Sequence, residues 1–151
     1  MAMILDHVGI AVRSIERALE LWETAFGYRQ ETEIVTNTRQ RVRVVFLGHP
    51  GSVPVKLVEP TDPSSPIHAF SQRGGGLHHL CFRAESLDAE LARLEALGLR
   101  VVVPPEPGDA FENERIAFVY AGDGLSIEIL DTLKRAGRLS ATSTPEAPEA
   151  R

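Results

Sequence analysis

Four residues of this sequence could do chemistry together, and they form two pairs with the same spacing. His7 and His79 lie 72 residues apart, and Lys56 and Glu128 have the same separation. Two imidazoles and a carboxylate are ligands that suit a divalent metal such as Zn, Ni, Co, Mn or Fe(II). A histidine on a strand is more often structural than metal-binding, so the shared spacing matters only if it has a structural cause.

That cause is an internal repeat. Residues 5–19, LDHVGIAVRSIERAL, and residues 77–91, LHHLCFRAESLDAEL, superpose without a gap at the same offset. In each copy an apolar strand is followed by a serine that can cap a helix, and then by helical periodicity. We expect the two helices to end at Gly27 and Gly98, because glycine favours helix termination.

The offset continues into the later strands, where VKLVEP (55–60) corresponds to IEILDT (127–132). Each half is therefore predicted to contain a strand, a helix and about three further strands. The sequence predicts an α+β fold made of tandem βαβββ modules. The expected boundaries are one domain at 1–133 with modules at about 4–60 and 76–132, and a C-terminal tail at 134–151 that lacks apolar periodicity.

Strand alternation assigns the two histidines to one face. His7 shares its face with the small residues Gly9 and Ala11, which leave room for a cavity, whereas the bulky alternate residues should pack on a helix. By the repeat, His79 and Cys81 take the cavity face. We expect His78 to lie on the helix-packing side, together with Leu80 and Phe82.

Composition excludes several classes of partner. The chain has 151 residues, 43% of them hydrophobic, and a net charge of −5, so it has no basic excess for nucleic acid. A small molecule is the expected partner.

Cys81 is the single cysteine, which excludes an intramolecular disulfide, and the N-terminus MAMILD lacks the features of a signal peptide. No stretch is long enough to span a membrane, and we expect a cytoplasmic protein.

The motifs LDHVGIAV, GGGLHHLCF and GLSIEIL resemble the strand motifs of the vicinal oxygen chelate superfamily, which includes glyoxalases, bleomycin resistance proteins and dioxygenases. VRVVFLG, KLVEPTDPSSPI and RIAFVYAGDG are most similar to its methylmalonyl-CoA epimerase-like members. The resemblance implies that the two modules curl into a cupped, partly open mixed-sheet barrel with a metal at its floor. The superfamily supports many reactions on one frame, so the fold does not determine the reaction.

The resemblance implies that His7, His79 and Glu128 are metal ligands. It also implies a metal-dependent isomerase, epimerase or lyase that stabilises an enolate-like anion of its substrate. The implied substrate is a small carbonyl compound or an acyl thioester such as an acyl-CoA. Glu128, or water held by the metal, would move the proton.

Two positions depart from the family pattern: Lys56 replaces a Gln or Glu ligand, and Val44 replaces the second acid of bacterial epimerases.

Lys56 has three interpretations. In the first, it contacts the substrate, hydrogen-bonding or protonating an oxyanion beside a metal held by the other three residues. In the second, its ammonium takes the place of the metal and pairs with Glu128, giving a metal-free binding pocket. In the third, it points outward as a solvated charge.

Two alternative functions remain open at this stage. One is a metal-free ligand-binding or resistance protein, and the other is an Fe(II)-dependent dioxygenase using the two-histidine, one-glutamate triad.

We expect substrate contacts from Lys56, from the inward-facing Val44 and from Phe111. Phe111 lies in an irregular connection at 104–114, where we expect it to act as a lid contact. Open sheet edges favour a homodimer.

Overall fold

The fold was analysed in a computed structural model, which describes residues 3–140. Its strands are β1 (Ile4–Ala11), β2 (Arg29–Gln30), β3 (Val35–Asn37), β4 (Val42–Gly48), β5 (Val55–Pro60), β6 (Gly76–Arg83), β7 (Arg100–Pro107), β8 (Arg115–Tyr120) and β9 (Ser126–Leu130). Its helices are α1 (Ile15–Phe26), α2 (His68–Gln72), α3 (Leu87–Ala96) and a short 3₁₀ helix at Asp109–Phe111. Within residues 3–140, every helix is too short or too polar to cross a membrane.

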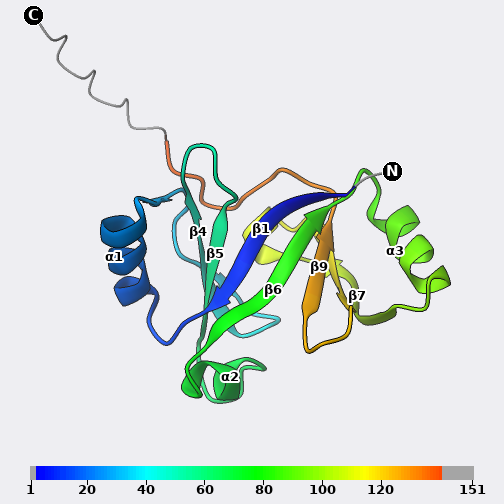
Figure 1. The fold of residues 1–151 in the computed structure, drawn as a ribbon, viewed down its shortest axis with the longest axis horizontal. Coiled ribbons are helices and arrows are strands. Elements are labelled where there is room, and N and C mark those ends of the chain that lie inside the picture. Colours follow the sequence, from blue (N-terminus) through cyan, green and yellow to red (C-terminus); the bar gives the residue numbers. More distant parts are fainter. Residues whose placement is uncertain (1–2, 141–151) are drawn as a thin grey trace, which may run out of the picture.

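All nine strands belong to one mixed sheet in the order β2-β4-β5-β1-β6-β9-β8-β7, with β3 paired to β4. The two modules meet at the antiparallel pair β1–β6 in the centre (Figure 1). On either side, β5 runs parallel to β1 and β9 runs parallel to β6. The tandem βαβββ prediction is therefore confirmed, and the sheet is cupped without closing into a barrel.

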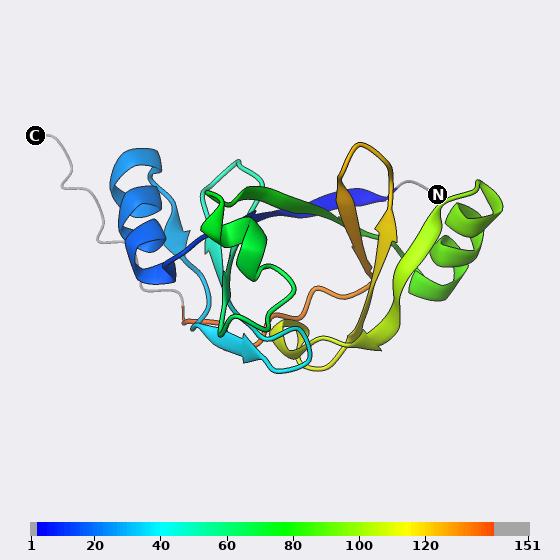
Figure 2. The same ribbon diagram turned by 90° about the horizontal axis from the view of Figure 1, so that it is seen from below.

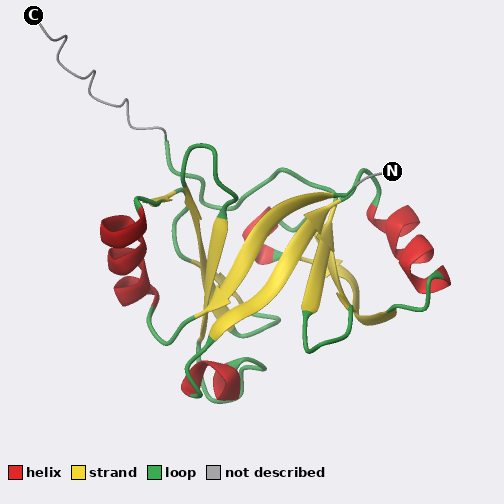
Figure 3. Ribbon diagram, in the orientation of Figure 1, coloured by secondary structure: helices red, strands yellow, loops and turns green. Residues whose placement is uncertain are grey.

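The two long helices, α1 and α3, lie on the outer flanks of this sheet (Figure 3). Ser14 and Ser86 cap α1 and α3 by accepting a hydrogen bond from the backbone N–H three residues later, as predicted. The α1 helix ends at Gly27, whose φ of 71° suits glycine. The last turn of α3 closes at Leu97, and Gly98 follows with a φ of 92° and a hydrogen bond from its N–H to the carbonyl of Glu95, so the predicted termination at Gly98 is also confirmed. The short α2 helix, which joins the modules, was not predicted.

Three apolar clusters result, one beneath each long helix and one inside the cup. Ile10 and Val12 pack with α1, whereas Leu80 and Phe82 pack with α3. Ala11 and Cys81 belong to the cluster inside the cup. The predicted faces of both central strands are therefore confirmed for these residues.

The β1–β6 ladder contains two irregularities that change the environment of the site. The pairing skips Asp6 on β1 and His78 on β6, and these residues precede the two candidate ligands His7 and His79. A bulge redirects the extra residue and breaks strict alternation. The prediction that His78 lies on the helix-packing side is wrong, because the bulge brings it into the lining of the internal cavity.

The expected irregular connection at 104–114 is also partly wrong, since β7 continues to Pro107. After β9 the chain crosses back from the second module to the first (Figure 2). Backbone hydrogen bonds at Ala136 and Gly137 attach this crossing segment, residues 131–139, to both halves of the domain.

Candidate metal and substrate site

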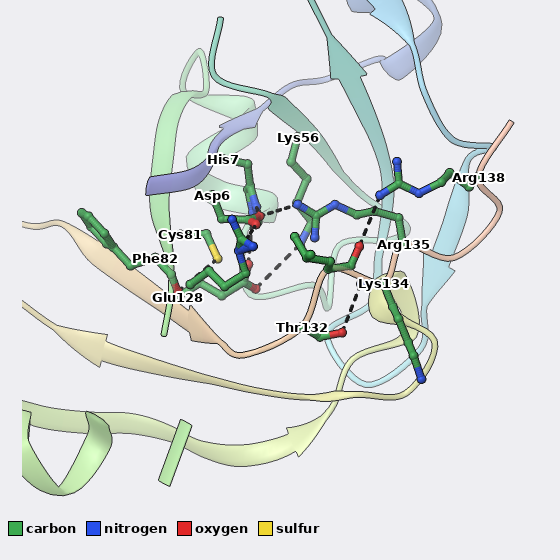
Figure 4. Close-up of polar contacts among 12 residues, drawn as sticks. Asp6, His7, Lys56, Cys81, Phe82, Glu128, Thr132, Lys134, Arg135 and Arg138 are labelled. Atoms are coloured by element: carbon green, nitrogen blue, oxygen red, sulfur yellow. Dashed lines mark hydrogen bonds and ion pairs between the residues drawn. The ribbon is translucent and has the colours of Figure 1, made fainter. Parts of the chain in front are cut away.

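Three side chains from the central strands and β9 meet inside the cup. The Nε2 atoms of His7 and His79 lie 3.3 Å apart. Glu128 Oε1 lies 3.1 Å from the first of these nitrogens and 3.8 Å from the second. All three side chains are buried (Figure 4 shows His7 and Glu128). The structure thus brings together the three candidate ligands predicted from the sequence.

The spacing of these three atoms suits a bound cation. Ligands held at about 2.1 Å from a metal lie about 3.0 to 3.4 Å from one another in octahedral or tetrahedral geometry. The three observed separations lie close to this range. Glu128 Oε1 is buried and has no hydrogen-bond donor among the described residues, which is costly unless a cation is there to satisfy it. The site therefore fits a divalent metal.

Each histidine is oriented through its other nitrogen. His7 Nδ1 lies 2.7 Å from Asp6 Oδ2, and His79 Nδ1 lies 2.8 Å from His78 Nδ1. Burial would raise the pKa of Asp6, but the His7 hydrogen bond and the charge of Arg135 lower it. An ionised carboxylate only accepts hydrogen bonds, so His7 Nδ1 carries the proton of this hydrogen bond and Nε2 is the nitrogen directed at the site.

The same arrangement recurs at the second histidine. Burial holds the pKa of His79 well below its ordinary value, so its imidazole is neutral. The Nδ1···Nδ1 contact with His78 allows His79 to carry its proton on Nδ1, and in that tautomer His79 Nε2 presents a lone pair to the site. Asp6 and His78 occupy equivalent positions of the repeat, so one bulge in each module supplies the group that orients each ligand.

Lys56 completes the floor of the site. Its side chain is 8% exposed, and Nζ lies 3.8 Å from Glu128 Oε2, so the outward orientation is excluded. Nζ also lies 5.0 Å from the ring centroid of Phe111 and 5.7 Å from that of Phe46. Burial alone would raise the pKa of Glu128, but Lys56 and the nearby His7 hold it well below its ordinary value. Glu128 is therefore a carboxylate.

A cavity of about 400 Å³ opens above this floor. Most of its walls are apolar, and they include Val42, Val44, Val58, Ile67, Phe111 and Phe118. Val44 and Phe111 are therefore placed as wall residues. Phe111 is buried in the 3₁₀ helix, so it forms fixed wall structure where the sequence predicted a lid.

Four residues near the site were not predicted to contribute to it. Asp6 and His78 each directly precede a candidate ligand. The polar pairs Asp6-His7 and His78-His79 stand at equivalent positions of the repeat, and this was the sequence signal for their role. The β7–β8 ladder is irregular between Val103 and Glu106, and after this shift Glu106 pairs with Ile116. Paired residues share a face of the sheet, so Glu106 lines the cavity together with Ile116. Arg135 lies in the predicted tail and carried no sequence signal.

The chain is similar to known proteins in both sequence and structure. A model of the Glyoxalase/Bleomycin resistance protein/Dioxygenase superfamily matches residues 6–118. The chain therefore belongs to this superfamily.

Its relatives include methylmalonyl-CoA epimerases. The epimerase from Mycobacterium tuberculosis has a similar crystal structure, with a TM-score of 0.74, 36% identity and coverage of 84% of this chain and 86% of that one. A variant of the Streptomyces coelicolor enzyme in complex with 2-nitronate-propionyl-CoA has a TM-score of 0.74 and 27% identity, with coverage of 85% and 96%. The uncharacterized protein YqjC of Bacillus subtilis is 35% identical over 133 residues, which are 84% of this chain and 91% of YqjC.

Gly9 provides a test of the ligand geometry. A Cβ atom at Gly9 would overlap Cε1 and both nitrogens of the His79 ring, so Gly9→Ala must displace the imidazole. Metal at a hundredfold excess over its Kd should stabilise the wild-type protein by about 2.7 kcal/mol. We expect the variant to lose most of this increment in thermal unfolding measured with and without Zn²⁺.

Gly51→Ala is the matched control. Gly51 has a φ of +74° and open space around its Cβ position. Its substitution should cost about 1 kcal/mol of stability in the metal-free protein through backbone strain and leave the metal-dependent increment unchanged. An undiminished increment in Gly9→Ala would contradict the assignment of His79 as a ligand.

Proposed function

We propose that the chain is a metal-dependent acyl-CoA epimerase, or a closely related isomerase, that removes a proton beside a thioester carbonyl. The observation that supports this most is the floor of the cavity, where ligand atoms of His7, His79 and Glu128 lie close enough together to hold a cation beneath apolar walls. The similarity to methylmalonyl-CoA epimerases supports the substrate class. Concave apolar sites with a few convergent polar groups are typical of small-molecule binding.

In this proposal His7, His79 and Glu128 Oε1 hold the metal. A divalent metal there would supply Lewis acidity, which lowers the cost of negative charge on a carbonyl oxygen. Glu128 Oε2 faces Lys56 and is free to accept the substrate proton. The ammonium of Lys56 stabilises negative charge that develops on the substrate, and the apolar walls exclude water and strengthen that interaction.

Inversion of a carbon centre requires a proton to return on the side opposite to its removal. Val44 cannot supply this proton. Glu106 lines the same cavity from β7, and it is the second carboxylate among the described lining residues. It therefore takes the role of the second acid in this proposal, with Glu128 acting from β9.

The proposed proton abstraction can be measured by exchange in heavy water. Metal-loaded protein should introduce deuterium at the carbon beside the carbonyl of at least one member of a panel that includes methylmalonyl-CoA and ethylmalonyl-CoA. Glu128→Gln should slow exchange at least about a hundredfold, because it removes the base. Metal content is determined for each sample. Absence of exchange for the whole panel with metal-loaded wild-type protein would refute the function.

Glu106→Gln separates exchange from inversion. We expect the variant to exchange the substrate proton at a rate near that of the wild type but to epimerise at least about a hundredfold more slowly, since one acid is lost. Chiral analysis of the recovered thioester measures both rates in one sample. Glu112→Gln, an exposed change in the same connection, should leave both rates unchanged. Normal epimerisation by Glu106→Gln would rule out its role as the second acid.

A metal-free binding protein is the second candidate function, and the buried Lys56–Glu128 contact favours it. In that case the Lys56 ammonium provides the positive charge beside the histidines, and the cavity only binds its ligand. Elemental analysis of protein purified without added metal distinguishes the two functions. About one equivalent of metal, absent from a His79→Ala variant, supports the enzyme, whereas no metal under any loading condition supports the binding protein.

Lys56→Gln should increase metal affinity at least about tenfold. The reason is that a positive charge 3.8 Å from a ligand carboxylate competes with the cation for it. Competition with a fluorescent chelator measures the affinity. Weaker metal binding by the variant would show that Lys56 assists the cation, contrary to this expectation.

A further inference from the structure

The segment that follows β9 lies against the back of the metal site. It crosses from the second module to the first and is held by backbone hydrogen bonds on both sides. The N–H of Ala136 donates to the carbonyl of Ala110 at 2.9 Å, and the N–H of Glu33 donates to the carbonyl of Gly137 at 2.8 Å. The backbone on both sides of Arg135 is therefore fixed.

Arg135 projects from this segment into the domain (Figure 4). It is 8% exposed, and its guanidinium forms an ion pair with Asp6 Oδ2. The same oxygen accepts the hydrogen bond from His7 Nδ1. The structure thus contains a continuous chain of contacts from the crossing segment through Arg135 and Asp6 to a candidate metal ligand.

The same guanidinium also packs on the aromatic rings that surround His7. Its central carbon lies 4.2 Å from the ring centroid of Phe46 and 5.2 Å from that of Phe111. Both rings contact the imidazole of His7, at centroid distances of 5.0 and 6.1 Å. Arg135 therefore restrains His7 by two routes: through a hydrogen-bonded carboxylate and through two packed rings.

We propose that Arg135 is a positioning residue of the metal site, which acts through Asp6 to hold His7 Nε2 toward the cation. A carboxylate that orients a ligating histidine must itself be held in place. A buried carboxylate also needs a compensating charge. Arg135 meets both needs at Oδ2 with one planar group, while Arg83 Nε lies 3.5 Å from the other oxygen, Oδ1. The inference rests on the proposed metal site and assigns a role to a segment that sequence composition alone would leave as a tail.

Cobalt binding tests the role without relying on activity. The full-length protein is freed of metal, titrated with Co²⁺, and its visible absorption spectrum and Kd are recorded. Arg135→Met keeps much of the side-chain volume and removes the charge, and we expect a 10- to 100-fold weaker Kd with an altered spectrum, about the loss usual for an outer partner of a metal ligand. Arg138→Met is the matched control on the same segment, because Arg138 contacts the carbonyl of Leu133 and is exposed.

A double-mutant cycle tests the route through Asp6. If Arg135 acts through this carboxylate, Arg135→Met should weaken Co²⁺ binding much less in an Asp6→Asn background than in the wild type. Full additivity of the two effects would overturn the proposed route. A purely structural role would lower the melting temperature of the metal-free protein and leave the Co²⁺ spectrum of the folded fraction unchanged.

Arg135→Lys keeps the experiment decisive should Arg135→Met fail to fold. Lysine retains the charge but cannot pair with Asp6 and stack on both rings at once, so we expect at least threefold weaker Co²⁺ binding. Wild-type affinity and spectrum in a folded Arg135 variant would overturn the inference while leaving the proposed metal site intact. Failure of the wild-type protein to bind Co²⁺ would instead overturn the metal site, and this inference with it.

Discussion

The burial of three electron-pair donors at one point is the constraint on which the rest of this structure depends. His7, His79 and Glu128 direct a nitrogen, a nitrogen and an oxygen toward the same small volume. When Nδ1 carries the proton in both imidazoles, the two Nε2 atoms and Glu128 Oε1 are all acceptors, so they have no proton to share among them. Such an arrangement repels itself unless positive charge lies at its centre. Both modules must therefore hold these side chains rigidly in place.

That support is duplicated with the modules themselves. The antiparallel pairing of β1 and β6 places the two histidines side by side, and each strand bulges one residue before its ligand. The bulge in β1 presents Asp6, and the bulge in β6 presents His78. Equivalent backbone irregularities thus provide chemically different partners, an anion for one imidazole and a neutral ring for the other. The two ligands are related by the repeat but are electrostatically unequal.

The repeat made much of the fold and the meeting of the three candidate ligands predictable, because both copies keep the same apolar periodicity at a constant offset. The position of His78 was not predictable by strand alternation, since a single bulge reverses the side of a residue. Glu106 was hidden for the same reason on β7. Arg135 was hidden because its burial depends on backbone contacts between segments far apart in sequence, which no local pattern records. The environment of Lys56 required the structure, because alternation alone allowed an inward or outward side chain.

Charge balance explains why Lys56 matters beyond its place in the ligand pattern. The buried charges around the site are Asp6, Arg135, Glu128 and Lys56, which sum to zero when the imidazoles are neutral. Arg83, whose Nε lies 3.5 Å from Asp6 Oδ1, is left out of this sum because its side chain is partly exposed and solvent screens its charge. In the proposed metal-bound state a divalent cation adds two uncompensated positive charges in a poorly solvated volume. With a neutral glutamine at position 56 the excess would be one. Lys56 therefore shifts the site toward a ligand that brings or develops more negative charge, such as a thioester that carries a carboxylate and becomes an enolate. The same excess weakens retention of the cation in the absence of that ligand, so binding of the metal and binding of an anionic substrate should favour each other.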